Sequence, residues 1–379
     1  MGRRWTVVQL IPAMNAGGAE RSTIEVARAL VAAGHRSIVI SAGGRWQSRL
    51  SVDGSEHITL PLDRKSVSAL WTAWRLRAVL RALKPDLIHV RSRLPAWIAR
   101  LALLGVRGVA RVSTVHGLNS VNAYSRIMTR AERVIAVSRT TRAHLLTHYP
   151  QLDPAIVRVI PRGVDAQEFD PQRALDPDWR AQFEADFPAL VGGKLLTLPG
   201  RGTRLKGHAD AIRLLAALRA RGVDARLLLL GVIESGREAY RSELMRLAAE
   251  LGVGEALVCT RSRPDVREVY ALSDLVLQLS QRPESFGRVV TEALALGRPV
   301  LGYDHGGVGE LLQDYYPAGL VPLGNLDIAA ERAEALLTAP PPVGEVAVPT
   351  VTDLQRLTLS VYAELLEGAA PDPACLADR

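Results

Sequence analysis

The sequence predicts an α/β protein made of two successive halves, each an open parallel sheet with helices on both faces. Short apolar runs such as 5–11 and 36–42 alternate with stretches of helical periodicity such as 17–34. The alternation breaks over 165–193, which is rich in Asp, Pro and aromatic residues, and restarts at 194–200. We therefore expect two tandem Rossmann-like domains. Because open parallel sheets bind ligands beyond the carboxyl ends of their strands, we expect the parallel sheets of the two domains to face each other across a cleft.

Each element follows from the same local patterns. Arg3 and Arg4 precede the first apolar run as in a signal peptide, but Gln9 and Pro12 interrupt that run, which favours a strand. The expected strands are 5–11, 36–42, 86–90, 110–115, 132–138 and 157–161 in the first half, and 194–200, 225–231, 256–260, 274–280 and 298–304 in the second. The expected helices are 17–34, 67–84, 95–104, 141–149, 207–221, 237–251, 286–297 and a final one near 353–367.

These elements predict three segments. Residues 1–188 form an N-terminal Rossmann-like domain and 189–352 a C-terminal one. Residues 353–379 form a terminal helix that packs back on the N-terminal domain, followed by a tail.

Composition narrows the class of protein. The 379 residues are 48% hydrophobic and 23% charged, a globular profile, and no run of about 18 uncharged apolar residues is present. The only cysteines, Cys259 and Cys375, are too distant in sequence to suggest a disulfide framework or a metal knuckle, which favours a reducing cytosol. A net charge of +8 suits an anionic partner, and the absence of a nucleic-acid motif favours a membrane surface or phosphorylated ligands over nucleic acid.

Two glycine-rich turns lead from strands into helices. Gly17 and Gly18 lie in NAGGAER (15–21), and Gly306 and Gly307 lie in DHGGVGE (304–310). Glycine lets the backbone approach a ligand, and the following helix N-terminus offers N–H groups to an anion such as phosphate. Ordinary strand-to-helix turns would have the same sequence, so the two interpretations stay open.

Two cations share a glycine-flanked loop after the first strand of the second half, LPGRGTRLKGH (198–208). Arg201 and Lys206 lie five residues apart, which suits a diphosphate held by one bidentate guanidinium and one ammonium group. The alternative is a solvated basic loop.

Two glutamates frame a third stretch, PESFGRVVTEALALGRPV (283–300). Glu284 falls before the predicted helix, Gly287 at its first turn, and Glu292 about 12 Å from Glu284 at the helical rise per residue. That separation suits a nucleotide sugar, with one carboxylate on a sugar hydroxyl and the other on the ribose. For Glu292 alone, a solvated helix face is the alternative.

His116 follows the strand that ends in STVHG. A histidine at the carboxyl end of a parallel strand lies where such folds bind ligands. The sequence is equally compatible with a purely structural role for His116.

These motifs, in this order, resemble the family 4 retaining glycosyltransferases, which have the GT-B fold. The resemblance rests on GGAER (17–21), AVSRTTRAHL (136–145), PRGVD (161–165), GRGTRLKG (200–207) and PESFGRVVTEALALGRPVLGYDHGGVGE (283–310). Arg162 departs from the family, which usually has Asn-Gly-Val-Asp at this loop.

The resemblance implies a role for each matching residue. Arg201 and Lys206 would bind the donor diphosphate, and Gly17 and Gly18 would approach its β-phosphate. Glu284 would contact the transferred sugar beside the backbone of Phe286 and Gly287, and His116 would lie near the reacting face of that sugar. Glu292 would hold the ribose, and Arg263 would border the base. The N-terminal domain would bind the acceptor and the C-terminal domain the nucleotide sugar. No cofactor or metal is implied, and the Asp-x-Asp sequence, Asp176 to Asp178, lies in the stretch between the halves.

The expected function is a metal-independent, retaining transfer of a hexose from a nucleotide diphosphate, UDP in the first instance, to a membrane-linked glycan or glycolipid such as a lipopolysaccharide core. The expected location is the cytoplasm, with a peripheral contact on the inner membrane as an open question. A sugar-nucleotide epimerase of the same fold and a non-catalytic nucleotide-sugar-binding scaffold are the alternatives.

Two groups of residues bear on the acceptor side. The helix 67–84 carries Trp71 and Trp74 among arginines, which suits an anionic lipid surface, but Leu70, Trp74 and Val79 could equally pack it into a core. The sequence HVRSRLPAW is expected to place His89, Arg91 and Arg93 toward the cleft, where a phosphorylated sugar would suit them.

Overall fold

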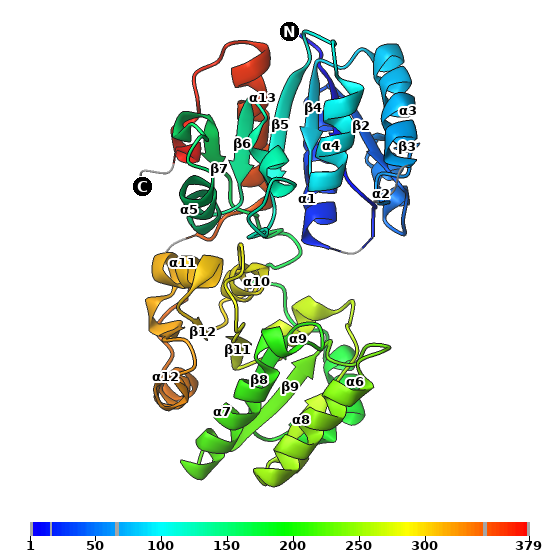
Figure 1. Ribbon diagram of the computed structural model, residues 1–379. Coiled ribbons are helices and arrows are strands. Elements are labelled where there is room, and N and C mark those ends of the chain that lie inside the picture. Colours follow the sequence, from blue (N-terminus) through cyan, green and yellow to red (C-terminus); the bar gives the residue numbers. More distant parts are fainter. Residues whose placement is uncertain (1–2, 16, 65–67, 344–346, 377–379) are drawn as a thin grey trace. The chain divides into compact units, whose positions relative to one another are not determined.

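The computed structural model describes residues 3–15, 17–64, 68–343 and 347–376 (Figure 1). Ala16 of the first glycine-rich turn and Val67 at the predicted start of helix 67–84 lie outside these residues. The chain divides into two compact units. Unit 1 comprises Met1–Arg162 with Val351–Arg379, and unit 2 comprises Gly163–Thr350.

Unit 1 is a sheet of seven parallel strands in the order β3-β2-β1-β4-β5-β6-β7. The strands are β1 (Thr6–Leu10), β2 (Arg36–Ser41), β3 (Glu56–Thr59), β4 (Leu87–Val90), β5 (Ala110–Val115), β6 (Arg133–Ala136) and β7 (Val157–Val159). The helices are α1 (Gly18–Ala32), α2 (Gln47–Val52), α3 (Ser68–Leu83), α4 (Arg93–Ala102), α5 (Arg139–His148) and α13 (Val351–Leu366). The sequence patterns missed α2 and β3, which are too short and too polar for a clear period.

Helices cover both faces of this sheet (Figure 1). On one face Val26 and Leu30 of α1 pack with Leu357 and Val361 of α13 against Leu87. The other face carries α3 and α4, in a second buried cluster. Successive strand residues point to opposite faces, so a strand buried on both sides reads as a continuous apolar run.

Unit 2 repeats the design with six parallel strands in the order β10-β9-β8-β11-β12-β13. The strands are β8 (Lys194–Pro199), β9 (Ala225–Leu230), β10 (Leu257–Cys259), β11 (Leu275–Gln278), β12 (Val300–Tyr303) and β13 (Leu320–Val321). The helices are α6 (Pro177–Asp186), α7 (His208–Ala220), α8 (Glu238–Glu250), α9 (Val266–Leu272), α10 (Arg288–Ala295), α11 (Gly306–Tyr315) and α12 (Leu326–Thr338).

The stretch between the halves is structured and belongs to unit 2. Residues 163–188 were expected to end the N-terminal domain, but they include α6, which Asp176 caps by accepting from the Asp178 amide (2.9 Å). Trp179 of this helix donates to Asp265 (2.8 Å), and the stretch also pairs at Val164 with Thr350. The helix was missed because it is short and polar, and its helical spacing is carried only by the aromatic residues Trp179, Phe183 and Phe187.

Both sheets reverse their strand order at one point, between β1 and β4 in unit 1 and between β8 and β11 in unit 2. Ligands of open α/β sheets bind outside the carboxyl ends of the strands at this reversal. A ligand is therefore expected at the residues that follow β1, β4, β8 and β11.

Candidate functional site

Lys206 and Glu284 form an ion pair at the carboxyl end of the unit 2 sheet. Lys206 ends the short 3-10 turn Arg204–Lys206 after β8, and Glu284 lies in the loop between β11 and α10. The Nζ of Lys206 is 2.7 Å from Oε1 of Glu284, and both side chains are about a quarter exposed. The sequence motifs were 78 positions apart, and the sheet reversal brings them together.

Glu284 is held by three donors on one oxygen. Besides Lys206, the Nε2 of Gln278 (3.1 Å) and the hydroxyl of Ser280 donate to Oε1. Within the described part of the chain, Oε2 receives no hydrogen bond, so it remains able to accept one from a ligand hydroxyl. The three donors fix the carboxylate without consuming that second oxygen.

Two helix N-termini adjoin the Glu284 loop. Gly287 is the N-cap of α10, and α11 begins at Gly306. The Gly307 amide donates to the Glu284 carbonyl (2.7 Å). Gly306 has a φ of 61°, and a Cβ there would lie 2.7 Å from the Glu284 carbonyl oxygen, so this close approach requires glycine. Helix N-termini carry partial positive charge, and the site therefore suits an anion.

The other predicted residues of unit 2 are placed individually. Arg201 is exposed in the loop after β8, and Phe286 is buried beside the α10 N-terminus. Glu292 is half-buried in α10, close enough to Tyr270 to add to the burial that raises the pKa of that phenol. Arg263 lies in a separate cluster, paired with both oxygens of Asp265 (2.9 and 2.6 Å).

Three residues of this site went unnoticed in the sequence. Gln278 and Ser280 are buried polar residues at the end of an apolar strand, and Nε2–H of His305, just before α11, donates to the Ser280 carbonyl (2.7 Å). A polar residue at the carboxyl end of an otherwise apolar strand is the signal that could have identified Gln278 and Ser280.

Unit 1 has its own pocket at the carboxyl ends of β1, β4 and β5. Its volume is about 200 Å³. The polar residues that line it include Glu20, Arg91, Arg93, His116 and Asn119. The predicted His116 is thus a pocket residue.

Arg162, the departure from the family motif, organises one side of this pocket. Its Nη2 lies 2.7 Å from Nδ1 of His116. A Cβ on Gly18 would collide with Nη1 of Arg162, so glycine at 18 leaves room for the guanidinium. Gly17 has extended backbone, and a Cβ there would collide with the Glu20 carboxylate. The turn expected to approach a ligand directly therefore also packs against Arg162 and Glu20.

His89 does not reach this pocket, contrary to expectation. It is fully buried on the α13 face, with Nδ1 2.6 Å from the Tyr362 hydroxyl and Nε2 2.7 Å from Thr114 Oγ1. Burial, with the charge of Arg91 as the second cause, lowers its pKa well below the usual value. His89 is a structural residue, whereas Arg91 and Arg93 line the pocket.

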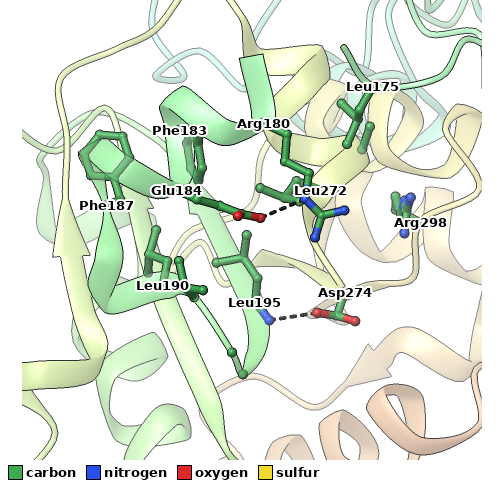
Figure 2. Close-up of a pocket in the computed structure, with 14 residues that line it drawn as sticks. Leu175, Arg180, Phe183, Glu184, Phe187, Leu190, Leu195, Leu272, Asp274 and Arg298 are labelled. Carbon is green, nitrogen blue, oxygen red and sulfur yellow. Dashed lines mark hydrogen bonds and ion pairs between the residues drawn. The ribbon is translucent and has the colours of Figure 1, made fainter. Parts of the chain in front are cut away.

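A cavity of about 460 Å³ lies at the opposite end of the unit 2 sheet (Figure 2). Leu195 near the start of β8 and Asp274 just before β11 line it, together with Phe183 and Phe187 of the α6 region. In Figure 2 the Arg180–Glu184 pair crosses the cavity wall. Because this end faces away from the strand carboxyl termini, the cavity lies apart from the Lys206–Glu284 site.

Comparison with protein families covers most of the chain. A family described as Glycosyltransferase Family 4 matches residues 16–168, and one described as Glycosyl transferases group 1 matches residues 182–345. The chain belongs to the family 4 glycosyltransferases of GT-B fold. The fold and family expected from the motifs are confirmed.

Relatives with a described activity are about 30% identical to this chain. A D-inositol 3-phosphate glycosyltransferase of Salinispora tropica is 31% identical over 274 residues, which are 65% of this chain and 55% of that relative. The matches span about half the length of such relatives.

Two solved structures share the fold over the whole chain. A glycosyltransferase from Rickettsia africae has a TM-score of 0.81 at 25% identity, covering 97% of this chain and 100% of its own. Anabaena Alr3699/HepE, solved with UDP and glucose, has a TM-score of 0.79 at 20% identity, covering 95% and 100%. At that identity the second likeness shows the fold alone.

Over the described ranges, no three His, Cys, Asp or Glu side chains gather as a metal site would require. None of the helices described is both long enough and apolar enough to cross a bilayer.

Proposed function

We propose that this glycosyltransferase transfers a hexose from a UDP-linked donor to a membrane-linked glycan, with retention of anomeric configuration and without a metal ion. Unit 2 binds the donor and unit 1 the acceptor. The observation that carries the proposal is the Lys206–Glu284 pair at two helix N-termini.

The chemistry of the leaving group explains this arrangement. Cleavage of a sugar–diphosphate bond develops negative charge on the diphosphate, and preorganised cations and N–H groups stabilise it. Lys206 and Arg201 supply the cations, and the partial positive charges at the N-termini of α10 and α11 add to them. These groups do what a bound divalent cation would otherwise do.

Glu284 has a different task. Its Oε2 accepts a hydrogen bond from a hydroxyl of the transferred sugar, while the three donors on Oε1 keep the carboxylate in position. Glu292 accepts from the ribose hydroxyls, and Gly17 and Gly18 approach the donor phosphates. His116 contacts the sugar near the reacting carbon. In a retaining reaction the acceptor attacks from the face that the diphosphate leaves, and the diphosphate takes the acceptor's proton.

Two observations support the donor and acceptor classes. The Anabaena structure of the same fold was solved with UDP and glucose, which favours a UDP-hexose. The helix α3 exposes Leu70, Trp71 and Trp74 beside arginines, which favours an acceptor at an anionic membrane surface, such as a lipopolysaccharide core. The inositol-phosphate relatives make a soluble phosphorylated acceptor the second candidate.

The test is a thermal-shift panel with UDP, GDP, ADP and CMP, each with and without magnesium. A ligand that binds the folded state raises its melting temperature by mass action. We expect UDP to stabilise the protein without magnesium, and Lys206→Ala to abolish the shift. Lys194→Ala is the matched control, because Lys194 lies at the opposite end of β8 and pairs with Asp274 at the surface.

Each alternative has its own signature. No shift with any nucleotide would contradict the donor site and leave only a role without nucleotide sugars. Conversion of free UDP-sugar without an acceptor would identify an epimerase. Binding of UDP-sugar with neither transfer nor conversion would identify a scaffold.

A further inference from the structure

The unit 1 pocket places two arginines at one opening. Arg91 follows β4 directly and Arg93 starts α4, and both line the pocket. Because a strand ends and a helix begins within three residues, both residues lie at the carboxyl edge of the sheet. This edge is where an open parallel sheet receives its ligands.

Arg91 is a buried cation with a neutral partner. The residue is 4% exposed, and its Nε (3.1 Å) and Nη2 both donate to Oε1 of Gln9. No described residue accepts a hydrogen bond from the third nitrogen, Nη1. Burial lowers the pKa of Arg91 to about 10, and the nearby Tyr362 and Glu25 oppose this only in part; Glu25 also pairs with Arg21 (3.3 Å). Desolvated charges are costly unless they are paired, so this guanidinium favours an anionic partner.

Contacts with uncharged groups orient Arg93, and they leave its positive charge uncompensated. Its Nη1 donates to Ser125 Oγ (3.1 Å), and its guanidinium lies 5.5 Å from the ring centre of Tyr124. Both contacts are with uncharged groups, and they orient the side chain without compensating its charge.

The one carboxylate that lines the pocket does not offset these two cations. Glu20 turns back toward the start of α1, where its carboxylate occupies the space of a Gly17 side chain. The helix N-terminus there favours a carboxylate. The pocket therefore keeps a net positive charge.

We propose that this pocket binds an anionic substituent, a phosphate or a carboxylate, on the acceptor sugar, with Arg91 and Arg93 as its ligands. The inference rests on the proposed function, because it makes unit 1 the acceptor-binding half. A volume of about 200 Å³ is of the size of one sugar ring with its substituent. The two guanidinium groups then select acceptors by charge.

The experiment is calorimetric titration of the full-length protein with glucose 6-phosphate, glucuronate and glucose. UDP is present at saturation, so that the phosphate-binding groups of unit 2 are occupied. If UDP does not bind, the same titrations are made on Lys206→Ala, so failure of the donor site and failure of this pocket are separate results.

We expect at least one anionic sugar to bind about tenfold or more tightly than glucose, as suits charge-assisted hydrogen bonds. Arg93→Gln weakens that binding about tenfold or more and leaves the UDP thermal shift unchanged. Arg100→Gln is the matched control, because Arg100 is exposed on the same helix, outside the pocket. Arg91→Lys provides a second test that keeps the charge but loses the bidentate geometry.

The arms also separate the two sources of charge. Preference for glucose 6-phosphate assigns a phosphorylated acceptor, and preference for glucuronate assigns an acidic sugar. Equal binding of all three sugars, or equal losses in Arg93→Gln and Arg100→Gln, would overturn the proposal.

Discussion

At the scale of single residues, His208 connects the loop that bears Arg201 and Lys206 to the core. It is fully buried at the first position of α7, two residues after Lys206. Burial lowers its pKa to about 4, and the backbone of Thr203 and Gly200 opposes this only in part. A helix N-terminus also disfavours a cation. The histidine must therefore stay neutral for the loop to keep its conformation.

This histidine predicts a pH dependence of stability. Between pH 6.5 and about 4 the unfolded chain binds a proton at His208 and the folded chain does not, so the free energy of unfolding falls as pH falls through this window. The loss at pH 5 amounts to roughly 2 kcal/mol. Calorimetry of unit 2 unfolding from pH 7.5 to 5 should show a shallower pH slope for His208→Gln than for the wild type.

Other buried histidines, such as His89, titrate equally in both proteins, so the difference in slope isolates His208. Identical slopes would show that His208 is protonated at little cost in the folded state.

At the scale of elements, α13 is the segment that returns from unit 2 to complete unit 1. Its Glu364 is buried and accepts from Arg158 (3.0 and 2.8 Å) and from Arg133 (2.7 Å). The helix thus joins the apolar cluster on one sheet face to β6 and to the edge strand β7. Two cations on one buried carboxylate satisfy its charge and specify where the helix packs.

Removal of Glu364 should be severe for unit 1. In Glu364→Ala the buried guanidinium of Arg158 loses its counter-charge, and the free energy of unfolding should fall by about 3 kcal/mol. Urea denaturation measures this, with Glu367→Ala as the control because Glu367 is exposed just beyond the helix. A loss below about 1 kcal/mol for Glu364→Ala would mean that apolar packing alone holds α13.

At the scale of the whole molecule, a chain with a net charge of +8 exposes tryptophans on α3. Leu70, Trp71 and Trp74 on α3 are 63%, 53% and 68% exposed, and Arg75 lies 4.8 Å from the ring centre of Trp71. The alternative in which Leu70 and Trp74 pack into the core is wrong. Tryptophan beside arginine suits the interface of an anionic bilayer, where the ring and the guanidinium each find their preferred surroundings.

Membrane binding through α3 is therefore expected, and it should depend on lipid charge. Flotation with vesicles containing anionic lipid should recover the wild type, whereas neutral phosphatidylcholine vesicles or high salt should not. Trp71→Ala with Trp74→Ala should lower recovery about tenfold. The double change of Met245 and Leu251 to Ala, at exposed apolar positions in unit 2, is the control. Similar recovery of the two double variants would exclude α3 as the contact.

The fold class, the two sheets and the family follow from the sequence. Strand and helix periodicities are local, and GGAER, the Arg201–Lys206 loop and the Glu284–Glu292 element are contiguous motifs. The ends of strands also follow from local pattern, and parallel strands place these ends at one edge. For that reason, the loops bearing Lys206 and Glu284 could be assigned to the same edge before any coordinates were known.

Contacts between distant residues depend instead on how the elements pack. The three donors on Glu284, the Arg162–His116 contact and the buried pairing of His89 with Tyr362 join residues far apart in the chain. An amphipathic pattern shows that a helix has an apolar face, but not which apolar residues a neighbour covers, so it could not reveal that Trp74 is exposed. The physical reason is that burial and hydrogen bonding of a side chain depend on strand order and packing between elements, whereas periodicity depends on neighbours in the chain.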